Sequence, residues 1–177
     1  MLKIFSTQLT GLFKKILENE EFSLEDGARL LAQAPIGDGI IYIFGTKEMK
    51  AVEVEALEGA EPLKGAKALN KAQFEELTEA DRVLLISRHS TDDEAKELAS
   101  NLWDKGIPFV SISTIEDEDA ESPLTDSADV HIDLRLTKGL LPDEFGNRFG
   151  FPHSMAALFV YYGLKFEIDE MLSEYDL

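Results

Sequence analysis

Five consecutive residues, 87-SRHST-91, combine side chains that can bind an anion. The serine and threonine hydroxyls can donate hydrogen bonds, and arginine and histidine can add positive charge. They follow the apolar run 83-VLLI-86 and precede a helical pattern, so nearby backbone N–H groups would lie at a helix N-terminus, which is a natural phosphate site. This interpretation assigns anion binding to Ser87, Arg88, His89, Ser90 and Thr91.

The same stretch has a second interpretation that needs no ligand. Thr91 with Glu94 has the Thr-x-x-Glu form of a capping box. Asp92, Asp93 and Glu94 also suit the positive end of a helix dipole, and their carboxylates would repel a phosphate. An ordinary joint between a strand and a helix therefore stays open beside the anion site.

The charge balance excludes some partners. Thirty-five Asp and Glu against 17 Lys and Arg give 177 residues a formal net charge of −18. Such a chain repels nucleic acid backbones and anionic membrane surfaces, so neither is expected as a partner. The acidic run 116-EDEDAE-121 is expected to form a solvated loop.

Composition and length indicate one globular domain. No apolar run approaches the ~20 residues that span a bilayer, and the N-terminus lacks a secretory cleavage pattern, so a cytoplasmic protein is expected. Cysteine is absent, which excludes disulfides and thiolate metal sites.

Alternating elements predict the fold class. Apolar runs predict strands at 40–45, 83–87, 109–113 and 130–134, with an edge strand near 66–69. Helical spacing predicts helices over 6–20, from a capped start at Ser23, over 48–58, over 95–103 and after Pro152. This order predicts an α/β protein, a three-layer α/β/α sandwich with a mostly parallel, doubly wound sheet. Residues 1–37 would be a helical extension packed on the domain 38–177.

In such sheets, ligands bind beyond the carboxyl ends of the strands. The loops that start at Gly45, Ser87 and Ser113 are therefore the expected site.

The segment 81-DRVLLISRHSTDDEAKELASNLWDKGIPFVSIS-113 resembles the central part of the SIS family, the sugar isomerase or phosphosugar-binding domain. The segments 38-DGIIYIFGTKE-48 and 127-SADVHIDL-134 resemble other parts of the family in the same order. The resemblance covers about residues 38–164 and is nearest to the phosphoheptose isomerases, within a small bacterial branch.

The resemblance implies a flavodoxin-like sheet, a phosphorylated sugar or related small anion as ligand, and assembly as a homodimer or homotetramer. Ser87 matches the first serine of the family's loop, His89 stands at its second serine and Ser90 at its glycine; its threonine falls on Thr91 or Asp92. The expected binding residues are Gly45, Thr46, Ser87, Arg88, His89, Ser90, Thr91 and Ser113, together with Arg148 as a cation that could pair with a sugar phosphate.

The resemblance also implies acid–base chemistry. Aldose–ketose isomerisation needs a base to move a proton between adjacent carbons, and phosphoheptose isomerases use a glutamate and a histidine. Glu48, Glu53 and His153 are the candidates here, although His153 could equally be a plain residue of a helix start. His131, inside a strand, is expected to be structural.

No cofactor is expected. A divalent metal would need two or more of His89, His153, Glu48 and Glu53 to converge, and the sequence has no close pair such as His-x-x-x-His to support one.

The segment 137–155 contains Lys138 and Arg148 and is long enough to be a lid or an interface arm. Its alternative is an exposed connection whose phenylalanines pack onto the core.

Together these features predict a phosphosugar-binding protein, with aldose–ketose isomerisation as its activity. The alternative is a non-catalytic sensor or assembly module of the same fold, with a site eroded at Gly45–Glu48 and at His89. A flavin or nucleotide binder is disfavoured because no glycine-rich fingerprint follows the first strand.

Overall fold

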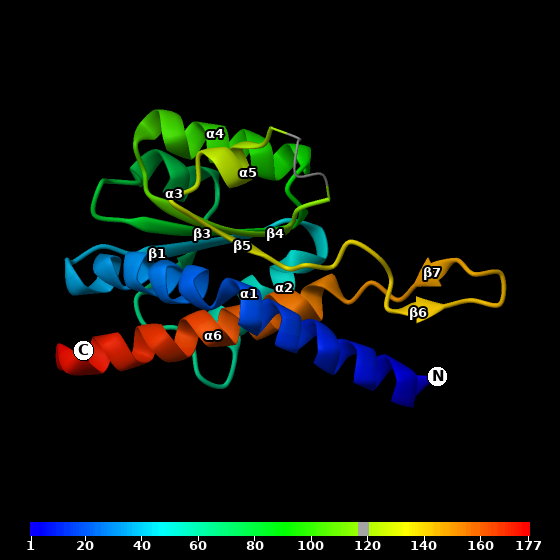
Figure 1. The fold of residues 1–177 in the computed structure, drawn as a ribbon. Coiled ribbons are helices and arrows are strands. Elements are labelled where there is room, and N and C mark those ends of the chain that lie inside the picture. The colour runs from blue at the N-terminus through cyan, green and yellow to red at the C-terminus, as the bar shows by residue number, and fades with distance from the viewer. Residues whose placement is uncertain (117–120) are drawn as a thin grey trace.

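The computed structural model describes residues 1–116 and 121–177. Figure 1 shows a central sheet with helices on both sides, which confirms the predicted three-layer α/β/α sandwich. The predicted solvated loop at 116–121 falls mostly on residues 117–120, which lie outside the described residues.

Five strands form one sheet in the order β2-β1-β3-β4-β5, and every neighbouring pair is parallel. This is the flavodoxin-like, doubly wound order, as predicted. The third strand continues to His89, two residues beyond its predicted end at Ser87. The strands are β1 Ile41–Gly45, β2 Ala66–Ala68, β3 Arg82–His89, β4 Phe109–Thr114 and β5 Val130–Asp133.

The helices divide between the two faces of the sheet. In Figure 1, α1, α2 and α6 cover one face, and α3, α4 and α5 cover the other. No helix in the described parts of the chain is long and apolar enough to cross a bilayer. The bounds are α1 Leu2–Ile36, η1 Lys47–Met49, α2 Lys50–Glu58, α3 Lys71–Glu76, α4 Asp93–Lys105, α5 Pro123–Asp126 and α6 His153–Glu174, with a hairpin of β6 Leu141–Pro142 and β7 Arg148–Phe149.

The central strands contribute side chains to two separate hydrophobic cores, one on each face of the sheet. In β3, Leu84 and Ile86 pack with α1, α2 and α6, whereas Val83 and Leu85 pack on the opposite face with α4. All four side chains are buried. A strand buried on both faces must be apolar at successive positions, which explains the uninterrupted run that predicted it.

The N-terminal region forms one continuous helix rather than two. The predicted new helix start at Ser23 is wrong, because α1 runs through it for 35 residues. Ile16 and Leu24 lie on one buried stripe that continues across Ser23. Packing of this stripe against α6 and the sheet stabilises the helix more than a cap at Ser23 would, since tertiary packing supplies most helical stability.

A partly buried ion pair joins α1 to the loop after β5. The Glu20 carboxylate accepts hydrogen bonds from Nε and Nη2 of Arg135, at 2.8 Å and 2.5 Å. Arg135 Nε also lies 3.2 Å from Oδ2 of Asp133. Residues far apart in the sequence are thereby held together at the carboxyl edge of the sheet.

We expect Glu20→Ala to lower the free energy of unfolding by about 1–2 kcal/mol, because it removes the charge-assisted hydrogen bonds between Glu20 and Arg135, whereas the contact of Arg135 with Asp133 remains. This is below the range for fully buried pairs, since the Arg135 side chain is 33% exposed. Urea denaturation measures the change. Glu18→Ala, at an exposed position of the same helix, is the matched control, and equal midpoints for the two variants would contradict the prediction.

Candidate functional site

The sheet order places a crevice between the loops that follow β1 and β3. From β1 the chain passes to α2 on one face, and from β3 it passes to α4 on the other. Loops that leave neighbouring strands toward opposite faces separate, and this is where doubly wound proteins bind ligands.

A cavity of about 460 Å³ lies at this edge. Its lining comes from η1, the end of β3, the segments after β4 and β5, and the start of α6. The lining residues are Glu48, Arg88, His89, Glu116, Thr137, Phe151 and His153.

Glu48 and Arg88 form a bidentate ion pair in the cavity. Arg88 donates from Nε to Oε1 of Glu48 at 2.6 Å and from Nη2 to Oε2 at 2.8 Å. These hydrogen bonds hold the pKa of Glu48 below its ordinary value. Glu48 is therefore ionised at neutral pH, and its two oxygens are occupied.

His153 opens α6 and is 3% exposed. Burial lowers the pKa of His153 to about 4, and the neighbouring side chains of His89 and Arg88 add to this lowering. Its ring centroid lies 5.1 Å from that of His89 and 6.1 Å from that of Phe151. Nε2 is buried and has no hydrogen-bonding partner within the described residues. A neutral imidazole with a free nitrogen is a group that can exchange a proton with a ligand.

His89 connects this group to the segment after β4. Its Nδ1 lies 3.4 Å from Oε2 of Glu116, which is an ion pair when the imidazole is protonated. His89 also pairs in register with Thr114 of β4.

Three predicted hydroxyl residues lie on adjacent strands. Thr46, Ser87 and Ser113 each follow a residue of one paired row, Gly45, Ile86 and Ile112. All three hydroxyl residues are buried. The hydroxyl of Ser87 donates to the carbonyl oxygen of His89 at 2.9 Å, whereas those of Thr46 and Ser113 have no partner in the described chain.

The N-cap of the helix after β3 lies one residue later than the capping box predicted. Asp92, not Thr91, is the N-cap of α4: its Oδ1 accepts from the N–H of Ala95 at 3.3 Å. Its Oδ2 accepts from Nζ of Lys47 at 3.1 Å. The predicted capping box of Thr91 and Glu94 is wrong. Because β3 extends to His89, the helix begins after Asp92, whose carboxylate both caps α4 and forms an ion pair with Lys47.

Glycine is required where β1 turns into η1. A Cβ at Gly45 would lie 2.5 Å from the carbonyl oxygen of Met49, too close for any side chain. The Gly45 N–H donates to Oε2 of Glu53 at 3.4 Å, so this carboxylate supports the turn. Glu53 does not line the cavity.

Other predicted residues have structural contacts. The N–H of Ser90 donates to the carbonyl of Thr114, and its own carbonyl accepts from Ser122. Arg148 lies on β7 and donates to the carbonyls of Gly139 and Leu140, at 2.9 Å and 3.2 Å. Neither residue lines the cavity, nor does Thr91, which is exposed.

His131 is structural, as predicted. Its Nδ1 lies 2.7 Å from the hydroxyl of Ser111 on the neighbouring strand. Burial lowers its pKa to about 4.

Four predicted residues thus converge: Glu48, Arg88, His89 and His153. Sequence reasoning missed Thr137 and Phe151 in the lining, and it assigned Glu116 to a solvated loop rather than to the site. Phe151 had a local signal, since it lies two residues before His153. Thr137 had none, because it reaches the cavity only through the path of the chain after β5.

No group of three or more His, Asp or Glu side chains within residues 1–116 and 121–177 is arranged to hold a metal ion. His89 and His153 do converge, but Glu48 is bound to Arg88 and Glu53 to the backbone of Gly45.

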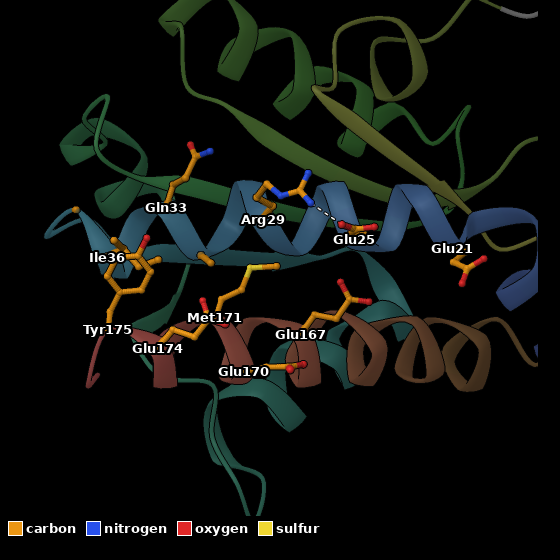
Figure 2. Close-up of a pocket in the computed structure, with 12 residues that line it drawn as sticks. Glu21, Glu25, Arg29, Gln33, Ile36, Glu167, Glu170, Met171, Glu174 and Tyr175 are labelled. Carbon is orange, nitrogen blue, oxygen red and sulfur yellow. Dashed lines mark hydrogen bonds and ion pairs between the residues drawn. The ribbon is translucent and has the colours of Figure 1, made fainter.

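A larger hollow of about 780 Å³ lies between α1 and α6 (Figure 2). Figure 2 shows glutamates along both helices, with Arg29 bound to Glu25. Burial, with Glu25 and Glu170 nearby, raises the pKa of Glu167. Such a surface repels an anion, so the smaller crevice at the carboxyl edge is the better candidate for an anionic ligand. The glutamates are Glu21, Glu25, Glu167, Glu170 and Glu174.

The model of one protein family, described as "Domain of unknown function (DUF2529)", matches residues 1–172. The chain belongs to this family. It is also 46% identical over 175 residues to "Uncharacterized protein YwjG" of Bacillus subtilis (strain 168), with 99% of each chain covered.

Solved structures share the fold of this DUF2529 protein at low sequence identity. The Vibrio vulnificus NanR protein complexed with ManNAc-6P has a TM-score of 0.69 and 14% identity, and the alignment covers 99% of this chain and 63% of NanR. The phosphoheptose isomerase GmhA from Neisseria gonorrhoeae has a TM-score of 0.65 and 13% identity, with 94% of this chain and 95% of GmhA covered. The predicted SIS-like fold is confirmed.

The buried histidines make a prediction about acid stability. The pKa of His131 and of His153 is about 4 in the folded protein, and about 6.5 is expected when unfolded. The unfolded state therefore binds more protons below about pH 6.5, so stability present above that pH is lost as pH falls toward about 4. We expect His153→Gln to lose less stability than the wild type over this interval in urea denaturation. Equal losses would contradict the lowered pKa of His153.

Proposed function

We propose that the crevice of this DUF2529 protein binds a phosphorylated sugar or a related small anion. The observation that carries the proposal is the convergence of the Arg88 guanidinium, the Glu48 carboxylate and the neutral imidazole of His153 on one cavity. Arginine binds phosphate with the same two-pronged geometry with which Arg88 holds Glu48. The SIS-like fold supports the proposal, since NanR has been solved with ManNAc-6P.

We further propose aldose–ketose isomerisation as the reaction. It requires a base that takes a proton from one carbon and returns it to the neighbouring carbon, and a second group that moves a proton between the two oxygens. Glu48, ionised and in the cavity, suits the first role. His153 suits the second, because it is neutral and its Nε2 has no hydrogen-bonding partner among residues 1–116 and 121–177. Glu53 supports the loop through Gly45 rather than reaching the ligand.

A non-catalytic role as a sensor or assembly module is the second candidate. Two observations favour it. Arg88 donates hydrogen bonds to both oxygens of Glu48, and the Asp92 carboxylate caps the N-terminus of α4, so the protein's own carboxylates occupy both groups. In that case the crevice would bind the sugar phosphate without converting it.

We also propose that the protein is a homodimer or homotetramer in the cytoplasm. Phe22 on α1 and Phe166 on α6 are 79% and 61% exposed, and aromatic side chains are enriched in subunit interfaces. The cytoplasmic setting fits the ligand class, because sugar phosphates are charged metabolites held inside cells.

Binding is tested by thermal unfolding with pentose, hexose and heptose phosphates. A ligand at about 100 times its Kd should stabilise the protein by about 2.7 kcal/mol through mass action. The matching unphosphorylated sugars are the controls and should leave the melting temperature unchanged. If none of the sugar phosphates raises it, the proposed function fails.

Catalysis is tested on whichever sugar phosphate binds. Glu48→Gln and His153→Ala should each lower kcat by about 10²–10⁴, because each removes an acid–base group. Glu18→Gln, at an exposed position of α1 outside the cavity lining, is the control and should retain activity. Binding without detectable turnover by the wild type would favour the non-catalytic role.

A further inference from the structure

Beside the crevice between β1 and β3, two positions are suited to an anion, and each holds one of the protein's own carboxylates. One is the N-terminus of α4, where the backbone N–H of Ala95 binds Asp92. The other is the guanidinium of Arg88, which binds Glu48. An anionic ligand has to displace one of these two carboxylates.

The α4 position is closed. The Asp92 side chain is only 6% exposed, and it is held both by the helix N–H and by the ammonium group of Lys47. Asp93 and Glu94 add two further negative charges in the first turn. A phosphate entering here would meet all three carboxylates and would leave Lys47 without its partner.

The Arg88 position is open to exchange. The side chains of Arg88 and Glu48 are 42% and 35% exposed, and both line the cavity. Ion pairs with this much solvent contact contribute only about 0–1 kcal/mol, so breaking the pair costs little. A phosphate offers the guanidinium the same pair of oxygen acceptors as Glu48, with more negative charge.

The polar groups around Arg88 favour a ligand there. His153 also lines the cavity, and its buried Nε2 has no partner in the described chain. His89 lies beside it, with ring centroids 5.1 Å apart. A ligand held by Arg88 would lie in the same cavity as a nitrogen atom that forms no hydrogen bond with the residues that the structure describes.

We propose that the ligand's phosphate replaces Glu48 on Arg88, and that this exchange releases the Glu48 carboxylate toward the sugar. The proposal rests on the proposed function and locates the phosphate at Arg88 rather than at the N-terminus of α4. Arg88 is then the residue that selects anionic ligands, and Glu48 is an internal competitor that keeps neutral sugars from gaining this contact.

The proposal predicts opposite effects for the two members of the pair. Glu48→Gln removes the competing charge, so it should tighten binding of sugar phosphates by up to about fivefold, corresponding to the weak ion pair that is no longer broken. Arg88→Gln should weaken binding by about 10-fold or more, because charge-assisted hydrogen bonds are lost. Isothermal titration with pentose, hexose and heptose phosphates measures both. Titration with inorganic phosphate shows whether the anion alone is sufficient.

Asp92→Asn is the matched variant at the other position. Asparagine is also a good N-cap, so the helix should keep its start. We expect sugar phosphate affinity to stay within about twofold of the wild type. Circular dichroism and the urea midpoint check that all three variants are folded.

Two results would overturn the proposal in distinguishable ways. If Asp92→Asn tightens binding while Arg88→Gln leaves it unchanged, the phosphate binds at α4; the location is then wrong and the proposed function stands. If neither the wild type nor Glu48→Gln binds any sugar phosphate, the proposed function fails, and the exchange at Arg88 fails with it.

Discussion

The parallel pairing of β1 with β3 determines the arrangement on which the crevice depends. Gly45 pairs with Ile86, so the two strands end at one edge of the sheet. The N–H of Thr46 donates to the carbonyl of Ile86 at 2.9 Å, which continues the pairing into the loop. The chain then leaves toward opposite faces, and η1 is held where Glu48 can contact Arg88.

Charge is the second constraint on the site. With a net charge of −18, the protein has many carboxylates that can approach any cation near the crevice. Lys47 and Arg88 each hold one, Asp92 and Glu48. Because the Asp92 side chain is buried and the Glu48 side chain is partly exposed, the two cations differ in how readily they can accept a ligand instead.

Local patterns predicted what depends on local physics. The runs at 40–45 and 83–87 are apolar because their strands are buried on both faces, and burial on both faces can be recognised without knowing the partners. The turn at Gly45 could also be predicted from the residue type, since this turn leaves no room for a Cβ. The errors at Ser23 and Thr91 have one cause: a residue that can cap a helix does so only where packing and strand pairing let the helix begin.

The strand order, the sandwich and the edge that carries the site are therefore contained in the chain's hydrophobic pattern and in its resemblance to the SIS family. The pairing of charged side chains cannot be predicted from that pattern. Glu48 and Arg88 lie 40 residues apart, and no local spacing favours this pair over others among 35 acidic and 17 basic residues. Register, burial and the path of the chain after β5 choose the partners, because an ion pair depends on distances of a few ångströms that only the folded backbone sets.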